Sequence, residues 1–359
     1  MKRCASMILA VMLLLTCVFA GTQRVYASEK AEQSRAIGIV FDNSGSMYIN
    51  GRMWWSQAIY AMEVFASMLN DGDVLQIYPM HDIKIGEETY TMKKPYQINS
   101  KDQASTIRDI CTLNAQGTPI ETIDYAAEGV AKLKQDKKYL IVLTDGDGFH
   151  TIASGTEKPL DNTVGALNAR FDKYANEKLT VMYLGIGPAV TPTKAESEYF
   201  IKRKAAESTA VLSTLTEMCN IIFVRDTMKE EINGKKYLDK ANKVINTDVS
   251  LKKVIVFVQG DGISGLKLSG AGVGTKVSES TTKYGIQGAK NYDSKPDTSL
   301  QGMMVTYKDC AAGTYNIEYT GTATSVEVYY EPNADLDFVF TDMDGNTVNP
   351  NALYEGNYK

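Results

Sequence analysis

Histidine and cysteine are scarce in this chain of 359 residues. There are two histidines, His81 and His150, and two of the five cysteines, Cys4 and Cys17, lie within the first 20 residues. The three others, Cys111, Cys219 and Cys310, cannot all pair within one chain, so the fold must rest on an apolar core. A Cys111–Cys219 bridge is compatible with the sequence, but we favour buried free thiols. Neither histidine stands in an obvious triad with a serine, so we expect no enzymatic activity.

Basic stripes and glycine-rich nucleotide fingerprints are also missing. Charged residues make up 23% of the chain, with a formal net charge of −5 and no long run of one sign. We therefore expect no nucleic-acid partner. Residues 270–276 lack the Gly-Lys-Ser/Thr order of a phosphate-binding loop and are interpreted as a β turn. We also expect no small-molecule substrate. The hydrophobic fraction of 44% excludes a disordered chain and a collagen-like repeat.

The N-terminus has the features of a secretory signal peptide. Lys2 and Arg3 precede an apolar run over residues 7–20, which is short for a membrane-spanning helix. Val25-Tyr26-Ala27 places small residues at the two positions that signal peptidase reads. We therefore expect removal of residues 1–27 and a protein that is secreted or displayed on the cell surface.

Strand-like and helix-like segments alternate after the signal peptide. Short, continuously apolar runs indicate buried strands over residues 36–41, 74–78, 139–143 and 179–184. Apolar residues at helical spacing predict helices over residues 55–69, 119–134, 162–176 and 213–223. The run Lys202–Lys204 is interpreted as a solvated helix face. The alternation predicts an α/β fold with a doubly wound, mostly parallel sheet over residues 34–228.

The character of the sequence changes after Lys229. Short strand-like segments, beginning with residues 254–258, are separated by turns rich in Gly, Asn and Asp. This pattern predicts an all-β sandwich domain over residues 245–331. Pro332 marks a seam, and residues 332–359 are expected to be the start of a further β module that is truncated at the end of the chain.

Hydroxyl and carboxylate side chains follow two of the predicted strands. Asp42, Ser44 and Ser46 come after the first strand, Asp145 comes after the strand at 139–143, and Thr118 opens a predicted helix. If these two strands are neighbours, their carboxyl ends bring all five oxygens together. Two carboxylates and three hydroxyls form a hard donor set that suits Mg²⁺, with Mn²⁺ or Ca²⁺ as further candidates. With the hydroxyls bound directly, the metal keeps an open position that favours an incoming carboxylate.

Simpler interpretations exist for each of these residues. Thr118 before Pro119 is typical of a helix N-cap. Asp42, Ser44 and Ser46 are common turn residues, and an Asp-Gly pair such as the one after the strand at 139–143 is typical of a plain turn. The order of the five residues and their positions at strand ends favour the metal site over these separate explanations.

Together these motifs resemble the von Willebrand factor type A domain over about residues 34–228. Asp42-Asn-Ser-Gly-Ser46 is similar to its Asp-x-Ser-x-Ser motif, Gly117-Thr118-Pro119 to its threonine loop, and Leu143-Thr-Asp145-Gly to its second aspartate motif. The resemblance implies a metal-ion-dependent adhesion site that binds acidic groups on partner proteins, usually with Mg²⁺. It also implies a central sheet with one antiparallel edge strand. Gln116 departs from the family, which usually has a second glycine there.

The β half resembles the immunoglobulin-like repeats of large bacterial surface proteins, although none of its motifs is specific. Taken together, these features indicate an exported protein that binds a protein ligand, presenting an acidic side chain, through Mg²⁺. A second hypothesis is a structural stalk or assembly subunit in which the metal only stabilises the fold. The partner's identity and the oligomeric state do not follow from the sequence.

Overall fold

A computed structural model describes eleven segments of the chain. They are residues 33–47, 54–80, 83–86, 89–92, 95–107, 117–146, 148–152, 157–283, 300–333, 340–341 and 347–348. The predicted signal peptide, Cys111 and His81 lie outside them. Within these segments, no helix has the length and apolar character needed to cross a membrane.

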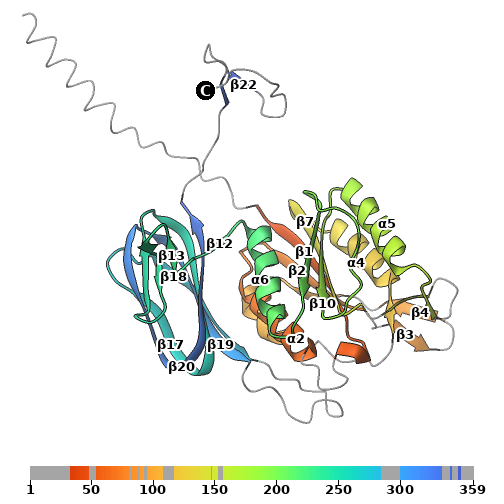
Figure 1. Ribbon diagram of the computed structural model, residues 1–359, viewed down its shortest axis with the longest axis horizontal. Helices are drawn as coiled ribbons and strands as arrows, with labels where there is room; N and C mark the ends of the chain where they lie inside the picture. Colours follow the sequence, from red (N-terminus) through yellow and green to blue (C-terminus); the bar gives the residue numbers. More distant parts are fainter. Residues whose placement is uncertain are drawn as a thin grey trace, which may run out of the picture.

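A six-stranded sheet is the centre of the first domain (Figure 1). Its order is β11-β10-β7-β1-β2-β5, and all neighbours are parallel except β5, which runs antiparallel to β2 at one edge. The bounds are β1 Arg35–Phe41, β2 Val74–Pro79, β5 Tyr96–Ile98, β7 Lys137–Thr144, β10 Thr180–Ile186 and β11 Phe200–Ala205. The four strands predicted from short apolar runs are therefore present, and the sheet has the antiparallel edge strand that the resemblance implied.

The interpretation of Lys202–Lys204 as a helix face was wrong. These residues lie in β11, which is the edge strand beside β10. An edge strand has one side without a neighbouring strand, so it accommodates polar side chains that would be excluded from the sheet centre. The polar content of β11 hid it from a search for apolar runs.

Helices cover both faces of this sheet. α2 (Trp54–Ser67) and α6 (Ala210–Phe223) pack on one face, while α4 (Glu121–Ala131) and α5 (Thr163–Asn176) pack on the other (Figure 1). Alternate residues of each strand enter the two cores: in β1, Ile39 faces α2 and α6, and Val40 faces α4 and α5. This two-sided burial explains why β1, β7 and β10 are continuously apolar.

The second domain contains one continuous antiparallel sheet of seven strands. Its path is β15-β16-β20-β17-β19-β18, and β12 pairs with β20. The bounds are β12 Asp226–Thr227, β15 Leu238–Asp239, β16 Val244–Thr247, β17 Leu251–Ser269, β18 Thr275–Lys283, β19 Gln301–Cys310 and β20 Gly313–Pro332. We predicted an all-β sandwich, which has two separate sheets. In the structure all seven strands belong to one sheet, whose two central strands, β17 and β20, are 19 and 20 residues long. Irregular register between these two strands accompanies their bending, and both halves of β17 contribute residues to one core.

The two domains share an apolar core. In β17, Val254, Val256 and Val258 point into the β domain, whereas Ile255 and Phe257 join the core beneath α2 and α6. Every residue of α2 after the first is buried. A helix that is covered on all sides is expected to pack against more than one layer, and α2 lies between the six-stranded sheet and the β domain (Figure 1).

Several shorter elements complete the described chain. They are the 3₁₀ helices η1 Gly45–Met47 and η3 Lys101–Thr106, and the strands β3 Ile83–Gly86, β4 Thr89–Met92, β6 Thr118–Pro119, β8 Phe149–Thr151, β9 Lys158–Pro159, β13 Glu231–Ile232, β14 Lys235–Lys236, β21 Phe340–Thr341 and β22 Thr347–Val348. β21 and β22 pair antiparallel with each other. Cys219 and Cys310 are buried free thiols, and burial raises the pKa of Cys219 to about 12.

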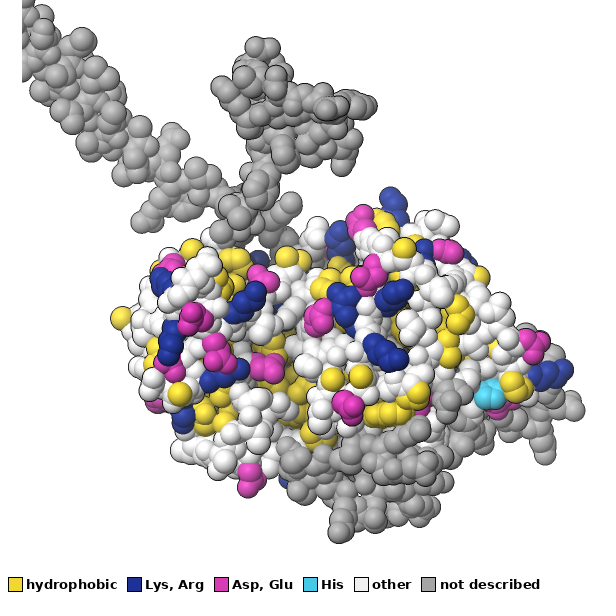
Figure 2. All heavy atoms as spheres, viewed as in Figure 1, with side chains coloured by type: hydrophobic (Ala, Val, Ile, Leu, Met, Phe, Trp, Pro, Cys, Tyr) yellow, Lys and Arg dark blue, Asp and Glu magenta, His cyan; other side chains and the backbone are white. Residues whose placement is uncertain are grey.

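Charge is distributed without segregation on the visible surface. On the face shown in Figure 2, lysine and arginine side chains are interspersed with aspartate and glutamate.

Candidate metal centre

Asp42 and Asp145 follow neighbouring strands of the sheet. β1 and β7 pair in parallel with Phe41 opposite Leu143, and the Asp42 backbone N–H donates a hydrogen bond to the carbonyl oxygen of Leu143 at 2.9 Å. Both aspartate residues are fully buried. The positive φ of Gly146, 55°, turns the chain immediately after Asp145. The carboxyl ends of β1 and β7 therefore hold the two carboxylates at one edge of the sheet.

A short turn after Asp42 brings two serine hydroxyls together. The Ser44 N–H donates to Oδ1 of Asp42 at 2.9 Å, which starts the turn that continues into η1. The Oγ atoms of Ser44 and Ser46 lie 2.9 Å apart. Because a hydroxyl keeps acceptor lone pairs while it donates, this pair can present oxygen to a cation on one side of the turn.

Thr118 is positioned by a strand instead of a helix end. It belongs to β6, which pairs in parallel with β8, and its Oγ1 donates to the carbonyl oxygen of Gly148 at 2.6 Å. The N-cap interpretation of Thr118 was wrong, because α4 begins at Glu121 and the residue before it, Ile120, makes no side-chain cap. Pairing with β8 instead ties Thr118 to the loop that follows Asp145.

Thr144 is a positioning residue that the sequence analysis did not single out. Its Oγ1 donates to Oδ2 of Asp42 at 2.6 Å and accepts the N–H of Gly146 at 2.9 Å. One buried hydroxyl thus connects the first aspartate loop with the second. In the sequence, its role was indicated only by its position next to Asp145, at the end of a buried strand.

The electrostatics of this edge are dominated by the two buried carboxylates. Burial raises the pKa of Tyr183 in β10, and the negative charges of Asp42 and Asp145 raise it further. Both carboxylates therefore act on the same phenol, whose hydroxyl donates to the carbonyl oxygen of Val190 at 2.5 Å. Two buried negative charges at one site are costly unless cations or hydrogen bonds compensate them.

The donor set fits a hard divalent cation. Two carboxylates and three hydroxyls provide only oxygen, which matches the ligand preference of Mg²⁺ and excludes a site built on thiolate or imidazole. Within the described segments, this edge included, no group of three or more His, Cys, Asp or Glu side chains is arranged to hold a metal, so a cation here would depend on the hydroxyls as well as on the two carboxylates. A bound Mg²⁺ would neutralise the two carboxylates, and the hydroxyls of Ser44, Ser46 and Thr118 would supply neutral ligands.

Aromatic and imidazole groups line the surroundings of this centre. The side chain of Trp54 is half-buried and packs over Gly187, just beyond the carboxyl end of β10, whereas Trp55 is buried against Phe41. His150 lies in β8 with its Nδ1 3.7 Å from Oε1 of Glu157. These contacts provide no nucleophile activated by a general base.

Comparisons with known proteins give weak structural similarities. No protein-family model and no curated protein sequence matches the chain. The von Willebrand factor domain of the type V pili tip protein Mfa5 from Porphyromonas gingivalis is 9% identical with a TM-score of 0.41, and the match covers 54% of this chain and 96% of that one. The pilus adhesin SpaC from Lactobacillus rhamnosus GG is 12% identical with a TM-score of 0.38, and the match covers 89% and 49%.

Proximal thread matrix protein 1 from the mussel byssus, in a structure with a zinc-occupied MIDAS motif, is 14% identical with a TM-score of 0.37. That match covers 55% of this chain and 49% of the mussel protein. The chain thus spans about half the length of the mussel protein and of SpaC. Identities and TM-scores this low do not establish a family, so the functional inference below rests on the residues of this chain.

Proposed function

We propose that this protein is an exported adhesive protein whose α/β domain binds Mg²⁺ and uses the metal to bind a protein partner. Asp42, Ser44, Ser46, Thr118 and Asp145 hold the cation. An acidic side chain of the partner completes its coordination. The protein acts by binding and not by catalysis, on the cell surface or in the surrounding medium.

The arrangement of hydroxyls and carboxylates at the ends of β1 and β7 carries this proposal. The three hydroxyls are neutral and withdraw little charge from Mg²⁺ as direct ligands, while the two aspartates, which hold it through water, balance the charge of the site as a whole. Such a metal favours an additional anionic oxygen ligand, and a partner's Asp or Glu supplies one.

Metal binding is tested first, without any partner. Mg²⁺ or Mn²⁺ is titrated against the mature protein by calorimetry and by thermal unfolding, and the Asp145→Ala variant is compared with the wild type. A ligand at about 100 times its Kd stabilises the folded state by about 2.7 kcal/mol. We expect this stabilisation in the wild type and in the control Asp161→Ala, which changes an exposed aspartate, and its loss in Asp145→Ala. An equal response in Asp145→Ala would refute the assignment of the site.

Partner binding is tested with an array of peptides that present a central Asp or Glu, each matched by its Asn or Gln counterpart. Binding to the acidic peptides alone, removed by EDTA and restored by excess Mg²⁺, is the expected result. Stabilisation by Mg²⁺ with equal binding to the acidic and amide peptides would support the second hypothesis, a stalk or assembly subunit in which the metal serves the fold.

A further inference from the structure

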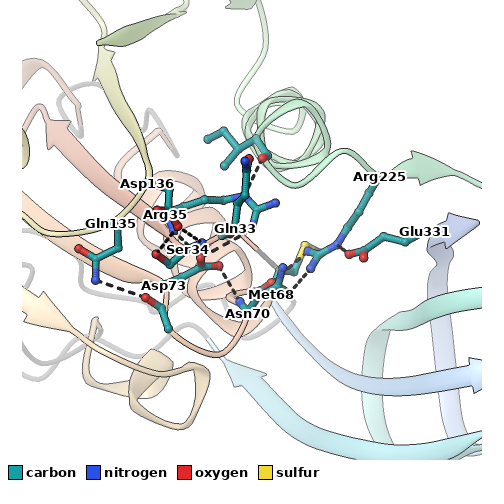
Figure 3. A network of polar contacts seen from close by, with 12 residues as sticks. Gln33, Ser34, Arg35, Met68, Asn70, Asp73, Gln135, Asp136, Arg225 and Glu331 are labelled. Carbon is teal, nitrogen blue, oxygen red and sulfur yellow. Dashed lines mark hydrogen bonds and ion pairs between the residues drawn. The ribbon is translucent and has the colours of Figure 1, made fainter. Parts of the chain in front are cut away.

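A buried polar cluster lies between the two domains, away from the candidate metal centre. It consists of Asn70 from the loop between α2 and β2, Arg225 at the end of α6, Lys253 of β17 and Glu331 of β20. The exposed fractions of the four residues are between 3% and 8%. Figure 3 shows Arg225 lying between Glu331 of the β domain and the Met68–Asn70 segment of the α/β domain.

The fold positions each member of this cluster. Lys253 and Glu331 are directly opposite each other on paired strands, on the face that also carries Ile255 and Tyr329 into the shared core. The Asn70 N–H donates to Oδ2 of the fully buried Asp73 at 2.8 Å, which holds the loop in place. The amine of Lys253, the amide of Asn70 and the carboxylate of Glu331 therefore come from three separate elements, each of which is held in place by the fold.

The amide oxygen of Asn70 accepts two cationic donors. Nζ of Lys253 and Nη2 of Arg225 each lie 2.6 Å from Oδ1. Lysine and arginine only donate hydrogen bonds, so the amide atom between them must be the oxygen. Two positive donors on one carbonyl oxygen withdraw electrons from Cγ and would stabilise negative charge on that oxygen, as an oxyanion hole does.

Glu331 is placed to accept a proton from the lysine. Its Oε1 lies 3.3 Å from Nζ of Lys253 and accepts Nε–H of Arg225 at 2.8 Å. Two cations therefore share one carboxylate in a buried site, and a carboxyl group that takes up a proton from the lysine still accepts the hydrogen bond from Arg225. Transfer of one proton from Nζ to Glu331 leaves a neutral amine, which is a nucleophile, next to a polarised carbonyl.

We propose that Lys253 and Asn70 form an intramolecular isopeptide bond. The lone pair of Nζ attacks Cγ, and Arg225 stabilises the negative charge that develops on Oδ1. A proton passes from Nζ to Nδ2, the Cγ–Nδ2 bond breaks, and ammonia leaves with the proton held by Glu331, as ammonium. One amide replaces another, so the reaction needs no oxidant, reductant or cofactor.

The surroundings suit this reaction. A cavity of about 10 Å³ is lined by Asn70, Arg225 and Lys253 among others, which is the room that one water-sized molecule requires. Ammonia is of that size and can leave through it. The tight packing otherwise keeps bulk water from hydrolysing the polarised amide. The product joins positions 183 residues apart in the sequence and fastens the β domain covalently to the α/β domain.

The test is the intact mass of the mature protein under denaturing conditions. The bond predicts a mass lower than that of the sequence by about 17 Da, the mass of ammonia. It also predicts a branched peptide containing Asn70 and Lys253 after proteolysis, and a faster-migrating band after boiling in detergent. A protein with the full sequence mass would overturn the proposal.

Variants separate the isopeptide bond from a succinimide at Asn70-Asp71, which loses ammonia as well. Lys253→Arg retains the buried positive charge but cannot form the bond, so we expect the full mass. Lys252→Arg, on an exposed neighbouring position, is expected to retain the loss. Loss of ammonia in Lys253→Arg would identify a succinimide and overturn the proposal.

Glu331→Gln tests proton transfer. We expect a folded protein, checked by circular dichroism, in which the fraction of cross-linked molecules falls at least tenfold at a given time after synthesis. Full cross-linking in this variant would remove Glu331 from the mechanism. If the variant does not fold, Lys253→Arg still decides whether the bond exists.

Discussion

The shared core predicts that the two domains unfold as one cooperative unit. Phe257 of β17 is fully buried and belongs to the core beneath α2 and α6. Replacing a buried phenylalanine by alanine removes its packing and leaves a cavity, at a cost of about 3–5 kcal/mol. We expect Phe257→Ala to lower the stability of both domains by this amount, although the residue lies in only one of them.

Tryptophan fluorescence provides the assay, because both tryptophans, Trp54 and Trp55, lie in α2 of the α/β domain. Urea unfolding is followed by fluorescence and by far-ultraviolet circular dichroism. With an m value of about 3 kcal/mol/M, the loss shifts the midpoint by at least about 1 M. Lys252→Ala, which changes an exposed residue of the same strand, is the control and should leave the midpoint in place.

Independent domains would give a different result. The tryptophan midpoint of Phe257→Ala would then stay at the wild-type value, while the circular dichroism curve would separate into two transitions. That outcome would refute the cooperative shared core. Lack of any change in either signal would show that Phe257 contributes less packing than its burial implies.

Three further predictions concern titration, strain and the metal centre. Burial raises the pKa of Tyr60 from 10.0 to about 12. Above pH 10 the phenol therefore ionises first in the unfolded state, and the free energy of unfolding falls by up to about 1.4 kcal/mol per pH unit. In thermal melts from pH 8 to 11, the melting temperature of Tyr60→Phe should fall less than that of the wild type. Val224 ends α6 with a φ of 54° and is 78% exposed. Glycine adopts this left-handed conformation without strain, so Val224→Gly should stabilise the protein by about 1 kcal/mol, whereas Val249→Gly, at an exposed position without positive φ, should not. Denaturant midpoints measure both effects, and a lower midpoint for Val224→Gly would contradict the prediction. Thr144→Val removes the hydroxyl that connects Asp42 with Gly146 and should weaken Mg²⁺ binding by about 10–100-fold in calorimetry, while an unchanged affinity would show that Thr144 does not orient Asp42.

The central strands, and the positions of Asp42 and Asp145 just after two of them, were predictable because their signals are local. A strand buried on both faces must be apolar at successive positions, as in β1 and β7, and polar residues directly after such strands stand out. Once β1 and β7 are recognised as parallel neighbours, Asp42 and Asp145 are expected at one edge. The edge strand β11 escaped notice because an edge position tolerates Lys202 and its neighbours.

The sequence indicated that Thr118 belongs to the candidate site, but it did not indicate which contacts hold the residue there. Threonine before proline satisfies the requirements of a helix N-cap, and nothing nearby in the sequence indicates that a strand around Phe149 will pair with it. Pairing between segments far apart in the chain depends on where the rest of the sheet places them. Local preference was therefore overruled by a tertiary contact.

Local chemistry along the chain was thus enough to indicate an α/β fold with an oxygen-rich edge, because burial and turn formation leave periodic and compositional traces. The arrangement of the two domains left no such trace. The outer face of α2 looks like any apolar helix face until the β domain, with β18 in contact, covers it. Asn70, Arg225, Lys253 and Glu331 are individually unremarkable polar residues. Their environment arises from mutual burial in the folded chain, since only there is the Lys253 amine removed from water and held against both the Asn70 amide oxygen and the Glu331 carboxylate.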